Sequence, residues 1–239
     1  SALLLLANIG GWNIQIDGEL GAKSPYVAMT SSLIERFPIE GGRLIIEPDA
    51  SSGSYFWAAG HILSVDDGLP IRVARWPKSG WQIDAEFPNF LPVPNVVSRL
   101  NDLGDSIMTS IVIAPLANHQ TQFINLERLR LQECERVQAL RVELTKCGAE
   151  IKETGDALTI NPGELKGAEI ETYDDHRIAM CFATLGLKVP GIRIKNPSCV
   201  RKTFPTFFYK LAAPSPVGLG AAVLDGQGNK LAVENLIAD

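Results

Sequence analysis

One pattern recurs along the chain and limits how it can fold: a polar or glycine-containing start, an amphipathic helix, and then a short β-branched strand. Alternation of helices and strands predicts an α/β (α+β) fold. Further helices are expected from about Gln132 to Lys146, from the 174–177 stretch and near Lys202, with a hairpin over 149–162. The clearest repeats pair helices at 27–37, 52–63 and 106–117 with strands at 43–47, 69–75 and 121–126.

Composition narrows the class of protein. The chain has 239 residues, 46% of them hydrophobic and 21% charged, which is enough for one large domain or two smaller ones. The net charge of −5 argues against general nucleic-acid binding, so any recognition of phosphate must be local. The four cysteines show no metal-ligand spacing and indicate buried thiols in a reducing compartment such as the cytoplasm.

Three segments bear on domain organisation. The apolar stretch 1–11, SALLLLANIGG, is too short and too broken to be a signal peptide or a membrane span, and it predicts a core helix. Because it opens without a cap residue, the natural protein is expected to extend upstream. A hinge is predicted at 47–49, where proline follows a strand, and a connecting loop at 76–94.

The stretch TYDDHRIAM, residues 172–180, poses a physical question. A helix start carries partial positive charge, so Arg177 in the first turn is locally unfavourable. Asp174 and Asp175 provide one explanation, as an ordinary N-terminal cap with an ion pair beside it. A bound phosphate or carboxylate provides the other.

Several other predicted helix starts carry chemically capable side chains. Each taken singly is explained as a cap or a solvated charge. Taken together, cations at positions that the helix dipole disfavours predict a shared, multiply charged anion in a cleft. Asp105 and Glu133 are then the candidates for general acid and base. The full set comprises Tyr26, Asp105, Glu133 with Arg136, His176 with Arg177, and Lys202.

Four segments carry a family resemblance: ETYDDHRIAMCF, NPSCVRKTFPTFF, EPDASSGSYF and LQECER. In this order and spacing the chain, from Ser1 to about Leu211, resembles the 3-phosphoshikimate 1-carboxyvinyltransferases, or EPSP synthases. The resemblance implies an inside-out α/β barrel-like domain of repeated helix–strand units within a two-domain architecture. Residues 1–47 would be the remnant of the first domain, 48–212 the second domain, and 213–239 an extension of unknown role, with the N-terminal half missing.

The resemblance also implies a reaction. EPSP synthases transfer the enolpyruvyl group of phosphoenolpyruvate to the 5-hydroxyl of shikimate 3-phosphate and release phosphate, without a metal or organic cofactor. Asp105 resembles the residue that deprotonates the hydroxyl, and Glu133 the proton-transfer partner near the methylene. Substrate binding would fall to Arg136 and Arg177 on phosphoenolpyruvate, Lys202 on its phosphate, His176 as a positioning group and Tyr26 beside shikimate 3-phosphate.

The match is not complete. Gln132 stands where the family usually has lysine, and Arg128, where asparagine is common, is expected to replace the missing charge in substrate binding. Two alternatives remain open: a non-catalytic binding or scaffold protein that keeps the fold, and the related transferase that acts on a UDP-amino sugar. As one half of an EPSP synthase, the isolated chain is expected to be weak or inactive, because one wall of a cleft alone cannot close around the substrates.

Overall fold

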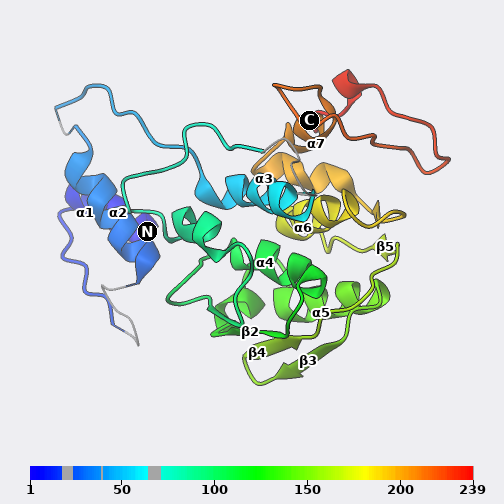
Figure 1. The fold of residues 1–239 in the computed structure, drawn as a ribbon. Helices are drawn as coiled ribbons and strands as arrows, with labels where there is room; N and C mark the ends of the chain where they lie inside the picture. Colours follow the sequence, from blue (N-terminus) through cyan, green and yellow to red (C-terminus); the bar gives the residue numbers. More distant parts are fainter. Residues whose placement is uncertain (18–23, 39, 64–70, 239) are drawn as a thin grey trace.

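The computed structural model describes residues 1–17, 24–38, 40–63 and 71–238 and has a mixed helix and strand architecture (Figure 1). The longer helices are α1 (Ala2–Gly10), α2 (Pro25–Arg36), α3 (Ala50–Leu63), α4 (Ile107–Ile113), α5 (Arg136–Lys146), α6 (His176–Gly186) and α7 (Phe207–Ala212). The 3-10 helices are η2 (Ile83–Phe90), η3 (Ala114–Leu116), η4 (Glu127–Leu131), η5 (Pro197–Lys202) and η6 (Val233–Asn235). The strands are β1 (Val96–Ser98), β2 (Thr121–Ile124), β3 (Ile151–Thr154), β4 (Ala157–Ile160), β5 (Glu169–Ile170) and β6 (Arg193–Ile194).

A small sheet forms one outer layer, with the strand order β1-β2-β4-β3. β1 and β2 are parallel, with Val97 opposite Phe123, whereas β4 is antiparallel to both of its neighbours. The β3–β4 hairpin turns at Gly155, whose φ of 61° lies in the left-handed region that glycine tolerates. The hairpin predicted over 149–162 is thus confirmed, as is the strand within 121–126.

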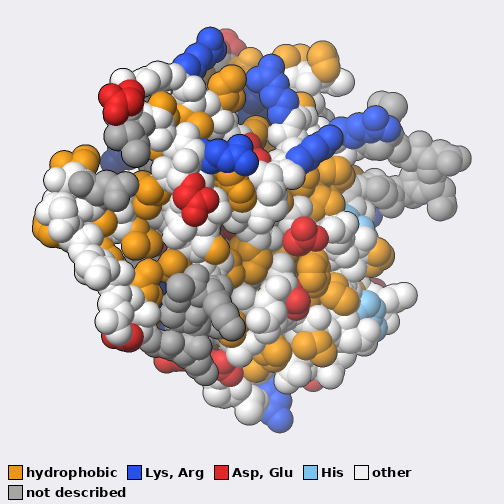
Figure 2. Space-filling view, turned by 90° about the vertical axis from the view of Figure 1, so that its left-hand side faces the viewer, with side chains coloured by type: hydrophobic (Ala, Val, Ile, Leu, Met, Phe, Trp, Pro, Cys, Tyr) orange, Lys and Arg blue, Asp and Glu red, His pale blue; other side chains and the backbone are white. Residues whose placement is uncertain are grey.

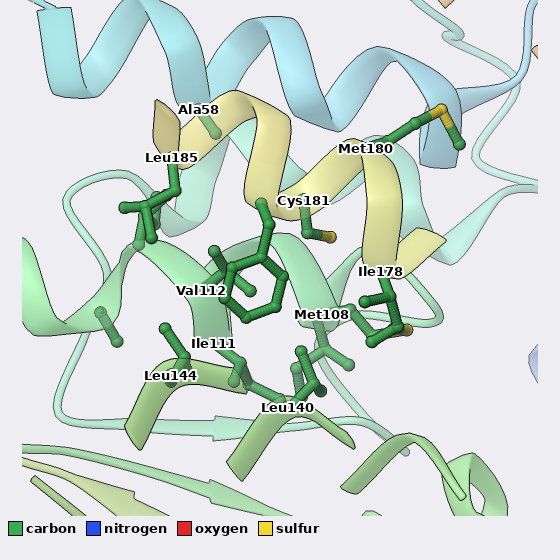
Figure 3. Packing of buried hydrophobic residues seen from close by; sticks show 14 of the residues in the cluster. Ala58, Met108, Ile111, Val112, Leu140, Leu144, Ile178, Met180, Cys181 and Leu185 are labelled. Atoms are coloured by element: carbon green, nitrogen blue, oxygen red, sulfur yellow. The ribbon is translucent and has the colours of Figure 1, made fainter. Parts of the chain in front are cut away.

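Helices α3, α4, α5 and α6 stack above this sheet and share one hydrophobic core (Figures 1 and 3). α4 is buried along its whole length, so it lies at the centre of the molecule. Apolar residues at helical spacing on α6 turn towards α4 and α5, which is why the 174–177 stretch leads into a buried helix. Side chains in this packing are Ala58, Met108, Ile111, Val112, Leu140, Leu144, Ile178, Cys181 and Leu185.

Phe207, on α7, forms the hub of an aromatic cluster that fixes α7 against α3. Its ring lies 5.6 Å from Tyr55, 6.0 Å from Phe56, 5.8 Å from Phe204 and 5.2 Å from Phe208, in edge or tilted geometry. Such pairs are favoured by the aromatic quadrupole. The tail after α7 then folds back over it through backbone hydrogen bonds, for example from the Leu219 amide to the Lys210 carbonyl (3.1 Å).

Two predicted strands are absent from the structure. Residues 43–47 are irregular, and Ile45 and Ile46 are 81% and 71% exposed. Their β-branched side chains favour a strand, but no neighbouring strand in the described part of the chain pairs with them. Residues 71–75 are also irregular, and the first two residues of that predicted strand, 69 and 70, lie outside the described residues. A strand propensity alone is insufficient where no neighbouring strand supplies the hydrogen bonds.

Several predicted boundaries also need correction. α5 begins at Arg136 rather than Gln132, because Glu135 caps it by accepting a hydrogen bond from the Gln138 amide. The last helix begins at Phe207, after the separate 3-10 turn η5. The loop predicted at 76–94 contains η2. The helix predicted at residues 27–37 is confirmed as α2, which begins two residues earlier, and Asp49 accepts a hydrogen bond from the Ser51 amide (3.0 Å) at the start of α3.

The prediction that the first apolar segment forms a core helix is half right. A helix forms as α1, but its apolar side chains are exposed rather than buried: Leu3 is 61% and Ile9 86% exposed. α1 packs against α2 at one side of the molecule (Figure 1). Within the part of the chain that the structure describes, no helix combines the length and the apolar character needed to cross a membrane.

The cysteines are free thiols, as predicted. Cys147, Cys181 and Cys199 are buried, and Cys134 is half-buried. Burial raises the pKa of the Cys147 thiol to about 11, which makes this thiol a poor nucleophile. Among the described residues, no group of three or more histidine, cysteine, aspartate or glutamate side chains could hold a metal ion.

Replacing the hub of the aromatic cluster tests this description of the core. Phe207→Ala is expected to lower the free energy of unfolding by about 3–5 kcal/mol, because it removes a fully buried ring and leaves a cavity. The measurement is urea unfolding followed by circular dichroism. Phe37→Ala, at a 60% exposed phenylalanine, is the matched control and should change stability by about 0.5 kcal/mol or less. Similar effects of the two substitutions would contradict the packing.

Candidate active site

Asp105 lies just before α4, at the centre of a group of arginine side chains. Its Oδ1 is 2.8 Å from Nη2 of Arg99, and its Oδ2 is 3.5 Å from Nε of Arg177 and 3.6 Å from Nη1 of Arg136. Burial disfavours the ionised form of this carboxyl, but the charges of Arg177, Arg99 and Arg136 outweigh burial and hold its pKa below the usual range. Asp105 is therefore an anion surrounded by cations.

Gln132 joins this group as a neutral bridge. Its Nε2 donates to both carboxylate oxygens of Asp105, at 3.3 and 3.2 Å, and its Oε1 accepts from Nη1 of Arg136 at 2.7 Å. Arg128, predicted to supply charge here, is exposed on η4 and forms no hydrogen bond or ion pair with any described residue. The structure brings Gln132 into the cluster and leaves Arg128 outside it.

Arg136 and Asp175 form the most deeply buried ion pair of the site. Arg136 is the first residue of α5 and is 1% exposed, and the Asp175 side chain is 0% exposed. Nε of Arg136 donates to Oδ2 of Asp175 at 2.7 Å, and Nη2 lies 3.3 Å from Oδ1. Because each charge is buried, loss of either partner would leave the other unpaired at a large cost. This pair ties the start of α5 to the start of α6.

The start of α6 resolves the question that Arg177 posed. Asp175 caps the helix, since its Oδ1 accepts a hydrogen bond from the Arg177 amide at 2.8 Å, which confirms the capping explanation for the backbone. The Arg177 guanidinium, however, points elsewhere, towards Asp105 and Tyr55. Burial disfavours its charge, but Tyr55 and Asp105 together raise its pKa. The side chain keeps 16% of its surface exposed.

Glu133 bridges two cations at the rim of the site. Its Oε2 is 2.8 Å from Nη2 of Arg136, and its Oε1 is 2.6 Å from Nζ of Lys202. Burial opposes ionisation, but the hydrogen bond from Lys202 and the charge of Arg136 lower the pKa of Glu133. Lys202 is 55% exposed, so it can leave Glu133 for another anion without a large rearrangement.

His176 is buried beside this network and uncharged. Burial lowers the pKa of its imidazole more than the neighbouring Asp175 raises it. Nδ1 lies 3.9 Å from Oδ1 of Asp175, too far for a hydrogen bond, and finds no acceptor or donor in the described part of the chain. A buried, unpaired ring nitrogen is available to a ligand.

Tyr26 reaches the site from α2. The Asp105 amide donates a hydrogen bond to the Tyr26 hydroxyl at 3.2 Å, and burial raises the pKa of that hydroxyl. The approach is close because residue 104 is glycine: a Cβ there would lie 2.5 Å from the Tyr26 hydroxyl and 3.0 Å from a carboxylate oxygen of Asp84. Tyr26 therefore links α2 directly to the backbone of Asp105.

A cavity of about 170 Å³ opens beside this contact. Arg177 forms part of its wall, and α2 covers it from one side. Its wall contains both polar and apolar side chains, which suits a small polar ligand that is oriented by charge. Its lining includes Tyr26, Met29, Ser51, Trp81, Asp84 and Arg177.

Three further residues belong to the site although the sequence did not reveal their part in it. Arg99 pairs with Asp105 but lies in no motif, in the turn after the unpredicted strand β1. Asp84 is 3% exposed and accepts hydrogen bonds from Ser51 and Ser106, yet it lies in a segment predicted to be a loop. Asp175 was expected only as a cap. The alternation of acidic and apolar residues at 83–87, with Asp84 between Ile83 and Ala85, is the one signal that could have identified Asp84.

The starts of α2, α4, α5 and α6 thus converge on one region, as the predicted shared cleft requires. The positive ends of the helix dipoles and the guanidinium groups of Arg99, Arg136 and Arg177 favour anions there. In the free protein, carboxylates pair with these cations. The arrangement can bind a phosphate or carboxylate ligand and place two carboxylates, Asp105 and Glu133, next to it as proton carriers.

Comparison with known proteins identifies the family. The family model of EPSP synthase (3-phosphoshikimate 1-carboxyvinyltransferase) matches residues 91–211. A protein named 3-phosphoshikimate 1-carboxyvinyltransferase from Nostoc punctiforme is 35% identical over 248 residues, covering 87% of this chain. The chain belongs to the EPSP synthase family. A second protein of that name, from Laribacter hongkongensis, is 35% identical over 257 residues and covers 89% of this chain.

Solved structures agree on the fold. An EPSP synthase from Acinetobacter baumannii superposes with a TM-score of 0.51 at 22% identity, over 72% of this chain and 48% of that one. This likeness confirms the predicted α/β (α+β) class and its enolpyruvyl transferase fold. The chain spans somewhat more than half the length of the curated EPSP synthases it matches, 57% and 59% for the two relatives above.

The buried Arg136–Asp175 pair predicts a specific acid sensitivity. The net depression of the Asp175 pKa means that its contribution to stability is complete above about pH 3.9, its unfolded value, and is lost as the pH falls further through the folded pKa. Asp175→Asn should lower the free energy of unfolding by about 3–5 kcal/mol at pH 7 and reduce the additional loss below pH 4. Urea unfolding at pH 7 and pH 3 measures both effects.

Asp174→Asn is the matched control for this prediction. The Asp174 side chain is exposed and accepts one hydrogen bond from Asn196, so the change should cost about 0.5 kcal/mol or less. An Asp175→Asn protein as stable as this control would show that the pair does not hold α5 and α6 together.

Proposed function

We propose that this chain forms one wall of an enzyme that transfers the enolpyruvyl group of phosphoenolpyruvate to the 5-hydroxyl of shikimate 3-phosphate, releasing phosphate. The observation that carries the proposal is the Asp105 carboxylate, which three arginines from three different segments surround at 2.8–3.6 Å. Membership of the EPSP synthase family supports the same reaction. Both substrates are anions, and the region around Asp105 is where an anion would be attracted.

In this reaction Asp105 would take the proton of the attacking hydroxyl. The hydroxyl oxygen then bonds to the central carbon of phosphoenolpyruvate while the methylene carbon gains a proton from an acid, for which Glu133 is the candidate. In the second step the bond to phosphate breaks, phosphate leaves, and the methyl group loses a proton to regenerate the double bond. Positive groups are needed wherever negative charge collects.

Substrate binding would change the proton affinity of both carboxylates in the useful direction. A phosphate bound by Lys202 would compete with Glu133 for that cation, and a carboxylate bound by Arg136 and Arg177 would neutralise charges that now lower the pKa of Asp105. Each loss of a positive partner raises a carboxyl pKa. The free protein thus holds Asp105 and Glu133 ionised. Bound ligands would raise the pKa values of both carboxyls, so that each could accept a proton more readily.

The remaining site residues have positioning roles in this proposal. His176, neutral and with an unpaired Nδ1, would hydrogen-bond the reacting groups. Tyr26 would pack beside shikimate 3-phosphate from α2. Gln132 would orient Asp105 and Arg136 through its amide. Arg128 would act only after it moved from its exposed position.

The proposal includes a second polypeptide part. The chain matches little more than half of each relative's length, and the apolar side chains of α1 are exposed: Leu3, Leu5, Leu6 and Ile9. Figure 2 views the side of the molecule that carries α1 and α2 and shows hydrophobic side chains gathered on it. An uncovered apolar face of this kind is typical of an interaction surface. We propose that the missing half, in the same or a separate chain, covers it, with residues 48–212 as the second domain.

Turnover of Asp105→Asn tests the catalytic assignment. With the chain completed by the part of the Nostoc punctiforme relative that it does not match, release of phosphate from phosphoenolpyruvate and shikimate 3-phosphate should fall by about 10²–10⁴-fold, since the amide cannot accept the proton. Asp156→Asn, at an exposed residue of the hairpin turn, is the matched control and should retain activity.

Three other outcomes would contradict the proposal. Equal activity of the two variants would remove Asp105 from the chemistry. Absence of turnover in a complex that has demonstrably formed would favour a binding protein that keeps the fold. Turnover with a UDP-amino sugar instead of shikimate 3-phosphate would identify the related transferase.

The covering of α1 has its own test. Leu6→Asp should weaken association with the supplied half at least about tenfold, measured by calorimetric titration, because it places a charge on an apolar contact. Leu224→Asp, at a 54% exposed leucine in the tail, is the control and should leave the affinity unchanged. Loss of affinity in both variants, or in neither, would show that α1 is not the contact.

A further inference from the structure

Arg99 is held more firmly than an arginine in an ordinary loop. It follows β1 directly, and its amide donates to the Ile124 carbonyl at 3.1 Å, which extends the β1–β2 pairing by one residue. The turn after it is closed by the Ser98 side chain, which accepts from the amides of Leu100 and Asn101. The Arg99 side chain is 8% exposed. The backbone of Arg99 is therefore fixed, and its buried side chain has little conformational freedom.

Arg99 contacts one oxygen of Asp105 and leaves the other less closely engaged. Nη2 of Arg99 lies 2.8 Å from Oδ1, whereas the cations nearest to Oδ2 are at 3.5 and 3.6 Å, on Arg177 and Arg136. The Gln132 amide is at similar distances from both oxygens, 3.3 and 3.2 Å. The carboxylate is thus held asymmetrically: one close contact, from Arg99, fixes Oδ1, whereas the contacts of Oδ2 are all longer, at 3.2–3.6 Å.

Stability alone does not explain this arginine. Nε of Arg99 is buried and has no hydrogen-bond partner within the described ranges, and an unpaired buried donor is destabilising. A buried charged side chain with an unpaired donor is a poor stabilising element when an apolar residue could fill the space. The contact that accounts for this arginine is therefore the one from its Nη2 group, which fixes Asp105.

We propose that Arg99 is a positioning residue for the transfer reaction, holding Oδ1 of Asp105 so that Oδ2 faces the substrate hydroxyl. The inference rests on the proposed function. Arg99 touches the base rather than the substrate, and it acts through orientation. A displacement of about 1 Å in a reacting group costs about 10²-fold in rate, so a loose Asp105 would be a slow base.

The first arm of the test needs no activity. In the chain itself, carbon-13 NMR titration of the Asp105 carboxyl should show an upward shift of its titration midpoint in Arg99→Met, because a close positive partner is removed. Arg99→Gln is the second variant, a polar replacement of similar length. Arg130→Met is the matched control: this arginine pairs with Glu135 and Glu153 and does not contact Asp105. An Asp105 midpoint unchanged in both Arg99 variants overturns the proposal.

The second arm uses the completed enzyme. Arg99→Met should lower kcat by about 10–100-fold with KM changed only a few-fold, and the acidic limb of the kcat profile should move to higher pH. Arg99→Lys, which keeps the charge but loses the planar fork, should recover part of kcat. Arg130→Met should leave kcat and the profile unchanged. A loss confined to KM, or no movement of the acidic limb, overturns the positioning role.

The two arms separate this inference from the proposed function. If the unsubstituted complex has no turnover, the proposed function fails, and the titration still decides whether Arg99 holds Asp105. If the unsubstituted complex turns over and the Arg99 variants match it, the reaction stands and the role of Arg99 fails.

Discussion

The buried pair of Arg136 and Asp175 is the interaction on which the rest of the site depends. It joins the first residue of α5 to the cap of α6, and through Asp175 it also fixes the backbone of Arg177. Arg136 in turn contacts Asp105, Glu133 and Gln132. An ion pair taken out of water is costly unless every remaining group is satisfied, and here additional hydrogen bonds satisfy it. Two helix starts are thereby locked into one charged surface.

Charge balance explains why such a surface is stable without a ligand. Arg99, Arg136, Arg177 and Lys202 are each paired with a carboxylate, so none of these four cations is left alone in the site. The same carboxylates are the candidate proton carriers. An incoming anion would replace them as partners of the cations, so binding and activation of Asp105 and Glu133 become one event. The site is preorganised by the groups that the reaction would use.

The sequence predicts the helices well and the strands less well, for physical reasons. α3, α5 and α6 carry caps and apolar stripes that are local signals, and the β3–β4 hairpin carries its own turn at Gly155. Residues 43–47 have strand-forming side chains but no neighbour, and β1 forms only because β2 lies beside it. Among the residues that the structure brings together around Asp105, those within motifs were predicted from the sequence. Arg99 and Asp84 were missed because their roles arise from contacts between distant segments.

Gly104 shows how a residue without chemistry can set the dimensions of a site. Its missing side chain allows the Tyr26 hydroxyl to reach the Asp105 amide, and any Cβ there would overlap that hydroxyl. The Tyr26 side chain of α2 can therefore contact the Asp105 backbone directly. A bulkier residue at this position would act as a spacer, widening the cavity wall that Tyr26 and Arg177 share. The distance between Tyr26, which lines the cavity, and the Asp105 backbone is thus set by a residue that has no side chain.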